Sequence, residues 1–284
     1  MSNRKTRYID PISPRDYHAA MRILRGFFVE KKGFVETPVQ HRLSILAACE
    51  DPRTIGQFAY AGELWPLPQT GQMHLEWELL TEPSVPGYFC VSTSYRNEPK
   101  PKDGRHNLIF PMFEFETHGG IEELKRLEKE LLEFSGFGPA QSFPEVAYRD
   151  AALMYGISEL TDVEEAKLCE THGQAVLLTD FPETTSPFWN MKRENGIAKK
   201  VDVLLCGIET IGSAERSTDP KEMAHLFDTI SDGMYRDILY SQFTRERVKR
   251  ELKEFLGLKF FPRCGGGIGI TRFIRALKIA GIHS

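Results

Sequence analysis

The sequence predicts an α+β domain in which helices flank a largely antiparallel sheet. Three observations support this prediction. Strand-like segments follow one another as hairpins, with residues 87–94 turning back into 108–117 and residues 201–206 into 210–213. Amphipathic segments with helical spacing precede, separate and follow these hairpins. The chain contains no internal repeat and no low-complexity linker, so residues 1–284 are expected to form a single domain.

The first helix is expected over residues 14–32, because Ser13 can cap it and Pro14 suits its first turn. Residues 34–39 follow as a strand, and Pro38 favours an edge position for it. An amphipathic helix that leads into an edge strand is a surface that can pair with a second copy.

The remaining elements alternate along the chain. Residues 41–68 are rich in turn residues and are expected to be irregular, whereas residues 99–107 should form a polar hairpin loop. Residues 145–173 should hold one or two short helices. Further helices are expected over residues 72–80, 122–134, 221–227 and 245–256, and a further strand over residues 175–179.

Composition argues against several classes of protein. The formal net charge is −4, and no basic block of the kind that follows a nucleic-acid backbone is visible. We find neither an apolar signal core nor a run of about 20 apolar residues, so no membrane span is expected. The five cysteines are widely spaced without a CxxC pair, which indicates reduced thiols in a cytoplasmic protein.

A glycine-rich run near the end of the chain is the most informative feature. Residues 265–272 read GGGIGITR and lead into a helix. Glycines let the backbone approach a ligand closely, and Arg272 brings a planar, permanently charged group to the same place. This combination suits a polyphosphate, although glycine clusters also form plain turns. Arg96, in the segment SYRNE at the end of another strand, strengthens the phosphate interpretation.

Two carboxylates share one face of the strand at residues 108–117. Glu114 and Glu116 alternate there with Phe113 and Phe115. Carboxylates on a central strand are costly unless they meet cations or metal. The pattern predicts either a pocket floor that binds an ammonium group, together with a magnesium–nucleotide complex, or the solvent-facing side of an edge strand.

The hairpin before this strand carries groups that suit a nucleotide. Arg96 can bind a phosphate, and Glu98 can accept a hydrogen bond from an exocyclic amine. Arg105 and His106 lie near the loop tip, and Phe110 at its base can stack on a purine. A basic hairpin tip can equally be an ordinary soluble loop.

Several segments resemble, in the same order, those of class II aminoacyl-tRNA synthetases of the aspartyl/asparaginyl subclass. Residues 95–98 (YRNE), 105–116 (RHNLIFPMFEFE) and 265–272 resemble motifs two and three of that family. Residues 34–38 resemble the end of motif one, and further active-site segments resemble residues 67–76, 202–205 and 209–216. The likeness runs from about residue 14 to residue 280 and implies the class II synthetase fold. Because motif one is the dimer-forming element of the family, the resemblance also implies a homodimer.

The resemblance implies that six side chains bind ATP: Arg96 at the α-phosphate, Glu98 at the adenine amine, Phe110 and Arg272 on the two faces of adenine, and Arg105 and His106 at the outer phosphates. Arg272 would also reach the γ-phosphate. Arg96 and Arg272 would be catalytic, because they stabilise the charge that develops when a carboxylate attacks the α-phosphate.

The resemblance also implies a metal site and an amino-acid site. Asp202 and Glu209 match the family's magnesium carboxylates, and oxygen ligands suit Mg²⁺. Gln72 and Glu114 would hold the ammonium group of the amino acid, and Arg216 would receive its side chain. The expected substrates are therefore ATP, with Mg²⁺, and aspartate, asparagine or an analogue.

Departures from the family pattern refine this expectation. Leu75 and Glu76 follow the asparaginyl pattern where an aspartyl enzyme has a lysine, and Met112 and Glu114 are also asparaginyl. Departures from the pattern of the whole family are found at Ile109, Thr210 and Ser213, and the usual terminal segment after motif three has no counterpart.

The acceptor of the activated acyl group is a separate question. The segment before residue 14 has no room for the anticodon-binding barrel of full-length relatives. We therefore expect transfer to ammonia or a small amine, as in ammonia-dependent asparagine synthetases, and no tight binding of tRNA. The alternatives are a truncated synthetase paralogue that charges tRNA or another carrier, and a non-catalytic binding module. The sequence leaves open which carboxylate of a dicarboxylic substrate is activated.

Overall fold

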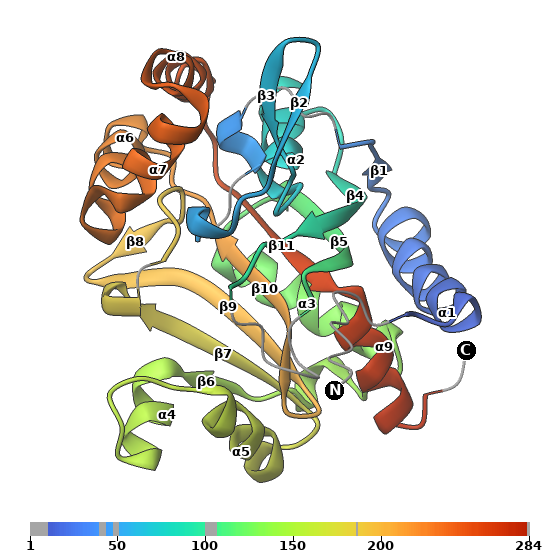
Figure 1. Cartoon of the computed structure of the whole chain (residues 1–284). Helices are drawn as coiled ribbons and strands as arrows, with labels where there is room; N and C mark the ends of the chain where they lie inside the picture. The colour runs from blue at the N-terminus through green and yellow to red at the C-terminus, as the bar shows by residue number, and fades with distance from the viewer. Residues whose placement is uncertain (1–10, 40–43, 48–50, 100–106, 186, 283–284) are drawn as a thin grey trace, which may run out of the picture.

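The structure, a computed structural model, describes residues 11–39, 44–47, 51–99, 107–185 and 187–282. A nine-stranded sheet with the strand order β1-β4-β5-β11-β10-β9-β7-β6 forms its centre, and β8 pairs with β9 beside this path (Figure 1). Among the described residues, no helix has both the length and the apolar character needed to cross a bilayer.

The sheet is antiparallel through its middle, which confirms the predicted α+β class. The six antiparallel neighbours are β4 (Gly87–Tyr95), β5 (Ile109–His118), β11 (Arg263–Gly269), β10 (Ile208–Glu215), β9 (Ile197–Leu205) and β7 (Ala175–Pro182). The short strands are β1 (Val35–Glu36), parallel to β4, β6 (Glu145–Ala147), parallel to β7, and β8 (Arg193–Glu194), antiparallel to β9.

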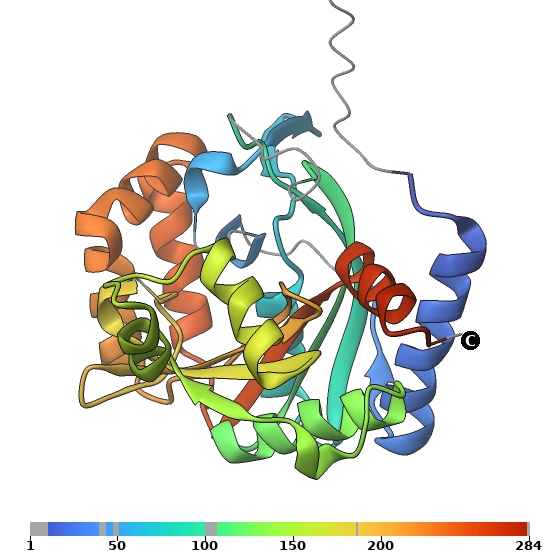
Figure 2. The same cartoon turned by 90° about the horizontal axis from the view of Figure 1, so that it is seen from below.

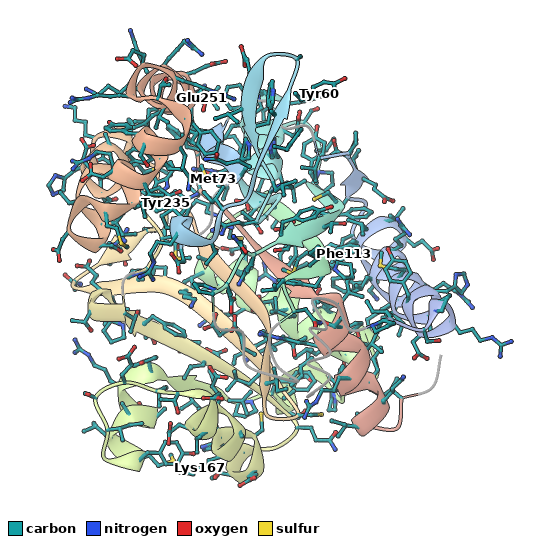
Figure 3. All side chains as sticks on the ribbon, in the orientation of Figure 1. Tyr60, Met73, Phe113, Lys167, Tyr235 and Glu251 are labelled. Carbon is teal, nitrogen blue, oxygen red and sulfur yellow. The ribbon has the colours of Figure 1, made fainter. Side chains whose placement is uncertain are left out.

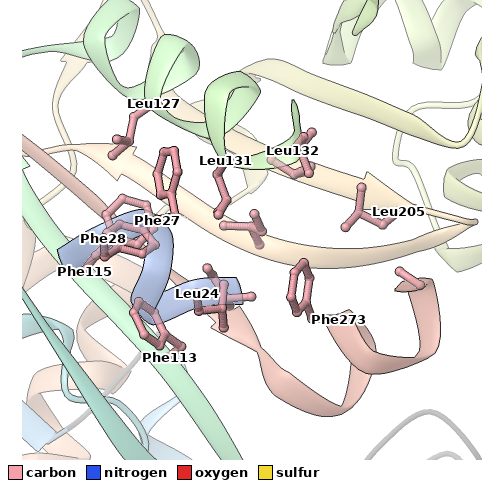
Figure 4. Close-up of a cluster of buried hydrophobic side chains, with 14 of the residues drawn as sticks. Leu24, Phe27, Phe28, Phe113, Phe115, Leu127, Leu131, Leu132, Leu205 and Phe273 are labelled. Carbon is pink, nitrogen blue, oxygen red and sulfur yellow. The ribbon is translucent and has the colours of Figure 1, made fainter. Parts of the chain in front are cut away.

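Three helices cover one face of the sheet (Figure 2). They are α1 (Pro14–Arg25), which continues as a π-helical segment at Gly26–Lys31, α3 (Ile121–Phe134) and α9 (Ile270–Ile279). The Phe28 ring packs against the rings of Phe113 and Phe115, with centroids 4.9 and 5.0 Å away (Figure 4). These strand phenylalanines therefore point into the core, and Glu114 and Glu116 point to the other face, as predicted.

Helices cover the ends of the opposite face. α4 (Tyr148–Tyr155) and α5 (Asp162–His172) pack at the β6–β7 end. At the other end a second apolar cluster joins the four helices α2 (Gln72–Thr81), α6 (Pro220–Thr229), α7 (Met234–Phe243) and α8 (Arg245–Leu256). Figure 3 marks this cluster by Met73 on α2 and Tyr235 on α7. On this face the middle strands lie between these two groups of helices.

Some predicted elements differ from the structure. The strand expected over residues 34–39 extends only over Val35–Glu36, where Pro38 lacks the N–H that a longer ladder would need. Residues 41–68, expected to be irregular, contain a hairpin of β2 (Gln57–Tyr60) and β3 (Glu63–Pro66). The helix α7 was not predicted, and most of the polar loop at 99–107 lies outside the described residues.

Glu128 is a fully buried carboxyl on α3, under the sheet. Burial raises its pKa to about 8, the nearby Asp202 carboxylate acts in the same direction, and the Ser213 hydroxyl opposes both. The folded protein therefore holds a proton on Glu128 at neutral pH, whereas the unfolded chain releases it near pH 4.5.

This difference predicts that stability falls as pH rises. Between about pH 4.5 and pH 8 the folded state binds one more proton than the unfolded state, so the free energy of unfolding should drop by up to about 1.4 kcal/mol per pH unit. Glu128→Gln, which stays neutral, should lose this decline. Urea unfolding of both proteins at pH 5.5 and pH 7.5 measures it, with Glu122→Gln on the exposed side of α3 as the control. An identical pH dependence in wild type and Glu128→Gln would contradict the prediction.

Candidate active site

A cavity of about 820 Å³ lies on the face of the sheet opposite α1, α3 and α9. Its lining comes from the middle strands β5, β9, β10 and β11, from the start of α2, from the first turn of α9, and from the segments that flank the β2–β3 hairpin. The predicted site residues that line it are Gln72, Arg96, Glu98, Phe110, Glu114, Glu209, Arg216 and Arg272. Asp202 borders a smaller cavity beside it, and Arg105 and His106 lie outside the described residues.

Strand register explains why the cavity lies over the glycine-rich run. Asp202 on β9 pairs with Gly212 on β10, Gly212 pairs with Gly267 on β11, and Gly267 pairs with Glu114 on β5. Two carboxylates thus flank two glycines in one row across the sheet. A Cβ on Gly267 would come within 2.8 Å of Met112 Cε. The missing side chains leave room for a ligand between the carboxylates.

Glu114 is buried at one end of this row. Its carboxylate accepts hydrogen bonds from Gly71 N (2.8 Å), Ser92 Oγ (2.5 Å) and Thr70 Oγ1. These donors fix the orientation of the carboxylate without supplying a cation. Since β5 lies inside the sheet between β4 and β11, the alternative of a solvent-facing edge strand is wrong.

Arg216 and Glu116 form a buried ion pair at the floor of the cavity. Both oxygens of Glu116 accept from the guanidinium, at 3.2 Å each, and Gly265 O accepts at 3.1 Å. Burial alone would lower the pKa of Arg216, but the carboxylates of Glu116 and Glu76 together raise it above its usual value. Gly265 allows this pairing, because a Cβ there would lie only 2.1 Å from Glu116 Oε2. Part of the glycine run therefore serves packing rather than ligand binding.

A second buried ion pair joins Glu76 on α2 to Arg263 at the start of β11. Arg263 Nε donates to Glu76 Oε1 at 3.0 Å, and Asn190 Nδ2 donates to Glu76 Oε2 at 2.7 Å. Glu76 is thus fully engaged beneath the floor. The sequence pattern had marked Glu76 only as an asparaginyl feature, and neither of its partners was predicted.

The arginines of the two sequence motifs line the same cavity. The Arg96 guanidinium lies 5.4 Å from the Phe110 ring centroid. The β4–β5 hairpin positions both residues, and Arg96 N continues its ladder by donating to Leu108 O at 2.8 Å. Arg272 lies in the first turn of α9, and its Nη1 donates to Glu209 O at 2.7 Å. Two cations and one aromatic ring therefore line the same cavity, an arrangement that suits a purine nucleotide with its phosphates.

The predicted metal carboxylates approach one point. Glu209 Oε1 and Asp202 Oδ1 lie 3.0 and 3.6 Å from the place that a Cβ on Gly212 would take. The described residues contain no cluster of three or more metal-binding side chains. Two carboxylates are nevertheless enough for Mg²⁺, which retains waters and shares phosphate oxygens with its nucleotide, so the donor set fits.

Lys200 is a further residue of the site that was not predicted. It lines the main cavity, and its Nζ lies 3.0 Å from Asp202 Oδ2. The signal was present in the sequence, because residues two apart on a strand share a face. Asn190 also lines the cavity, but nothing in the sequence distinguished it.

An antiparallel sheet with a glycine-lined cavity and two arginines is the architecture of class II synthetases. The sequence profile of the family described as tRNA synthetases class II (D, K and N) matches residues 15–280, and the chain belongs to this family. Its members are ligases that form an aminoacyl-adenylate from ATP. No curated protein sequence matches the chain significantly.

Solved structures agree with this fold. The chain is similar to asparaginyl-tRNA synthetase from Pyrococcus horikoshii, complexed with asparaginyl-adenylate, with a TM-score of 0.74 and 18% identity over 94% of this chain and 65% of that one. Asparaginyl-tRNA synthetase from Entamoeba histolytica gives 0.68 and 19% over 95% and 64%. Aspartyl-tRNA synthetase from the same organism gives 0.68 and 19% over 94% and 55%. The chain thus spans less than two thirds of each of these structures.

Proposed function

We propose that this protein activates a carboxylate of aspartate, asparagine or an analogue with ATP, releases pyrophosphate, and transfers the acyl group from AMP to ammonia or a small amine. The observation that supports it most is that one cavity is lined by Arg96, Arg272 and Phe110 and also holds Glu114 and the Arg216–Glu116 pair on its floor. A nucleotide and an amino acid can lie there side by side.

The chemistry follows from positioning and charge. A carboxylate oxygen of the amino acid attacks the α-phosphorus, the bond to pyrophosphate breaks, and the negative charge that develops lies near Arg96 and Arg272. Mg²⁺, held by Asp202 and Glu209, would neutralise phosphate charge. The acceptor amine then attacks the acyl carbon, AMP leaves, and the amine loses a proton to become an amide.

The floor of the cavity is suited to an amino acid. Glu114 offers a fixed carboxylate that can accept from an ammonium group, and Gln72 lies beside it, with Nε2 donating to Phe115 O at 2.7 Å. Arg216 can add a hydrogen bond to a carboxylate or amide oxygen, although Glu116 already shares its charge. Which end of a dicarboxylic substrate meets Arg216 decides which carboxylate is activated.

The distribution of charge supports a small acceptor. The net charge is −4, and two of the basic residues of α8, Arg245 and Arg247, contact other side chains of the chain. Arg247 pairs with Glu251 at 2.9 Å and lies 5.1 Å from the Trp65 ring centroid, and Arg245 lies over Tyr240. The similar structures are tRNA synthetases, and this favours tRNA or a carrier as the alternative acceptor.

The cysteine side chains bear on the location of the protein. Four of them, Cys90, Cys169, Cys206 and Cys264, are free thiols, which supports a cytoplasmic location.

ATP–pyrophosphate exchange tests the proposal directly. With Mg²⁺ present, the purified protein should exchange label in the presence of aspartate, asparagine or an analogue, and adding ammonia should yield AMP and an amide. Hydroxylamine and tRNA serve as comparison acceptors. Exchange with no amino acid at millimolar concentration would refute the activation step. Label that accumulates on tRNA, with no amide formed, would favour the alternative acceptor.

Loss of either arginine should damage turnover rather than folding. Arg96→Ala and Arg272→Ala each remove a charge placed near the transferring phosphate, so each should lower the exchange rate on the order of 10²-fold. Arg275→Ala, on the exposed side of the same helix as Arg272, is the matched control and should change the rate little. Unchanged turnover in folded Arg96→Ala protein would contradict the nucleotide assignment.

We also propose a homodimer formed through α1 and β1. β1 is an edge strand, and Val29 and Val35 are 43% and 41% exposed, which supports a covered surface there. An obligate interface should bury more than about 2,000 Å² in total. Sedimentation at micromolar concentration should give twice the chain mass, and Val35→Asp should shift the equilibrium toward monomer. A wild-type monomer would refute the proposal.

A further inference from the structure

Lys200 occupies an unusual place for a lysine, on the cavity face of β9 two residues before Asp202. Its Nζ lies 3.0 Å from Asp202 Oδ2 and 4.4 Å from the Phe181 ring centroid. Lys200 borders both the main cavity and a smaller cavity of about 140 Å³. The lysine therefore lies at the junction of the two spaces, bound to a residue that would hold the metal.

The formal charges around the two metal carboxylates cancel. Asp202 and Glu209 contribute two negative charges, and each has a cation beside it: Lys200 at 3.0 Å and Arg272 at 3.7 Å from a carboxylate oxygen. A divalent ion that approaches this pair alone meets no net negative charge. A divalent ion that arrives with ATP brings the phosphate charges with it.

We propose that Lys200 is an internal counter-ion of Asp202 that keeps the free enzyme from binding a divalent cation tightly, so that the metal enters together with the nucleotide. This inference rests on the proposed function for the identity of the metal and the nucleotide. It goes beyond that function, because it assigns to one side chain the order in which metal and nucleotide bind.

The surroundings of Lys200 allow its ammonium to leave Asp202 without leaving the site. The face of the Phe181 ring attracts a cation at 4.4 Å, and the smaller cavity lies next to both residues. When a metal takes Asp202, the ammonium keeps a favourable contact. The pairing can therefore be exchanged for metal binding at moderate cost.

Binding of Mn²⁺ in the absence of nucleotide tests this proposal. Electron paramagnetic resonance counts free Mn²⁺ for wild type, Lys200→Met and Lys200→Arg. Lys200→Met keeps an apolar chain over Phe181 but removes the charge, so its affinity for Mn²⁺ should rise about tenfold or more. Lys200→Arg should stay close to wild type.

Two controls locate the effect. Lys199→Met makes the same change at the neighbouring residue, whose Nζ pairs with Glu194 at 3.3 Å on the other face of the strand, and should leave Mn²⁺ affinity unchanged. Adding Glu209→Gln to Lys200→Met should abolish the gain, because the ion then loses one carboxylate. Circular dichroism checks that each variant is folded, and Lys200→Gln replaces Lys200→Met if the latter is not.

The outcomes are decisive and independent of turnover. An equal affinity in wild type and Lys200→Met overturns the proposal, as does an equal gain in Lys199→Met or a gain that persists with Glu209→Gln. Because no ATP or amino acid is present, a protein that failed in pyrophosphate exchange could still show the Mn²⁺ effect. The proposed function and the counter-ion role can therefore fail separately.

Discussion

Pairing of buried charges is the constraint on which the cavity depends. The Arg216–Glu116 pair lies at its floor and the Arg263–Glu76 pair beneath it, and each charge would be costly to bury without its partner. Together they join α2, β5, β11 and the residue that follows β10, so the contacts that neutralise these buried charges also fix elements that line the cavity. Asn190 donates a hydrogen bond to Glu76, and Gly265 O accepts one from Arg216, which completes the two pairs.

Much of this architecture could be predicted where a local pattern determines it. The alternation of Glu114 and Glu116 with two phenylalanines was enough to place a polar face and an apolar face on β5. The position of Arg272 at the start of a helix was also predicted correctly. The glycine run before it forms the central strand β11, which was not predicted as a strand. The correct predictions depend on side-chain period and on local helix signals, which the sequence records directly.

Other features depend on which distant segments meet. The partner of Arg216 could not be predicted as Glu116, because strand register alone brings residues 100 positions apart together. The β2–β3 hairpin was missed, since its strands are exposed on both faces and lack the alternation that marks a half-buried strand. Lys200 was missed although the period of β9 pointed to it.

The strand order also determines when this protein can fold during synthesis. β11, at residues Arg263–Gly269, lies between β5 and β10, which are made much earlier. Until the ribosome has released β11, the two halves of the sheet have no hydrogen-bonded connection, and both expose unpaired strand edges. The long separation in sequence predicts slow closure of the sheet, and a nascent chain that depends on protection of those edges until β11 has emerged.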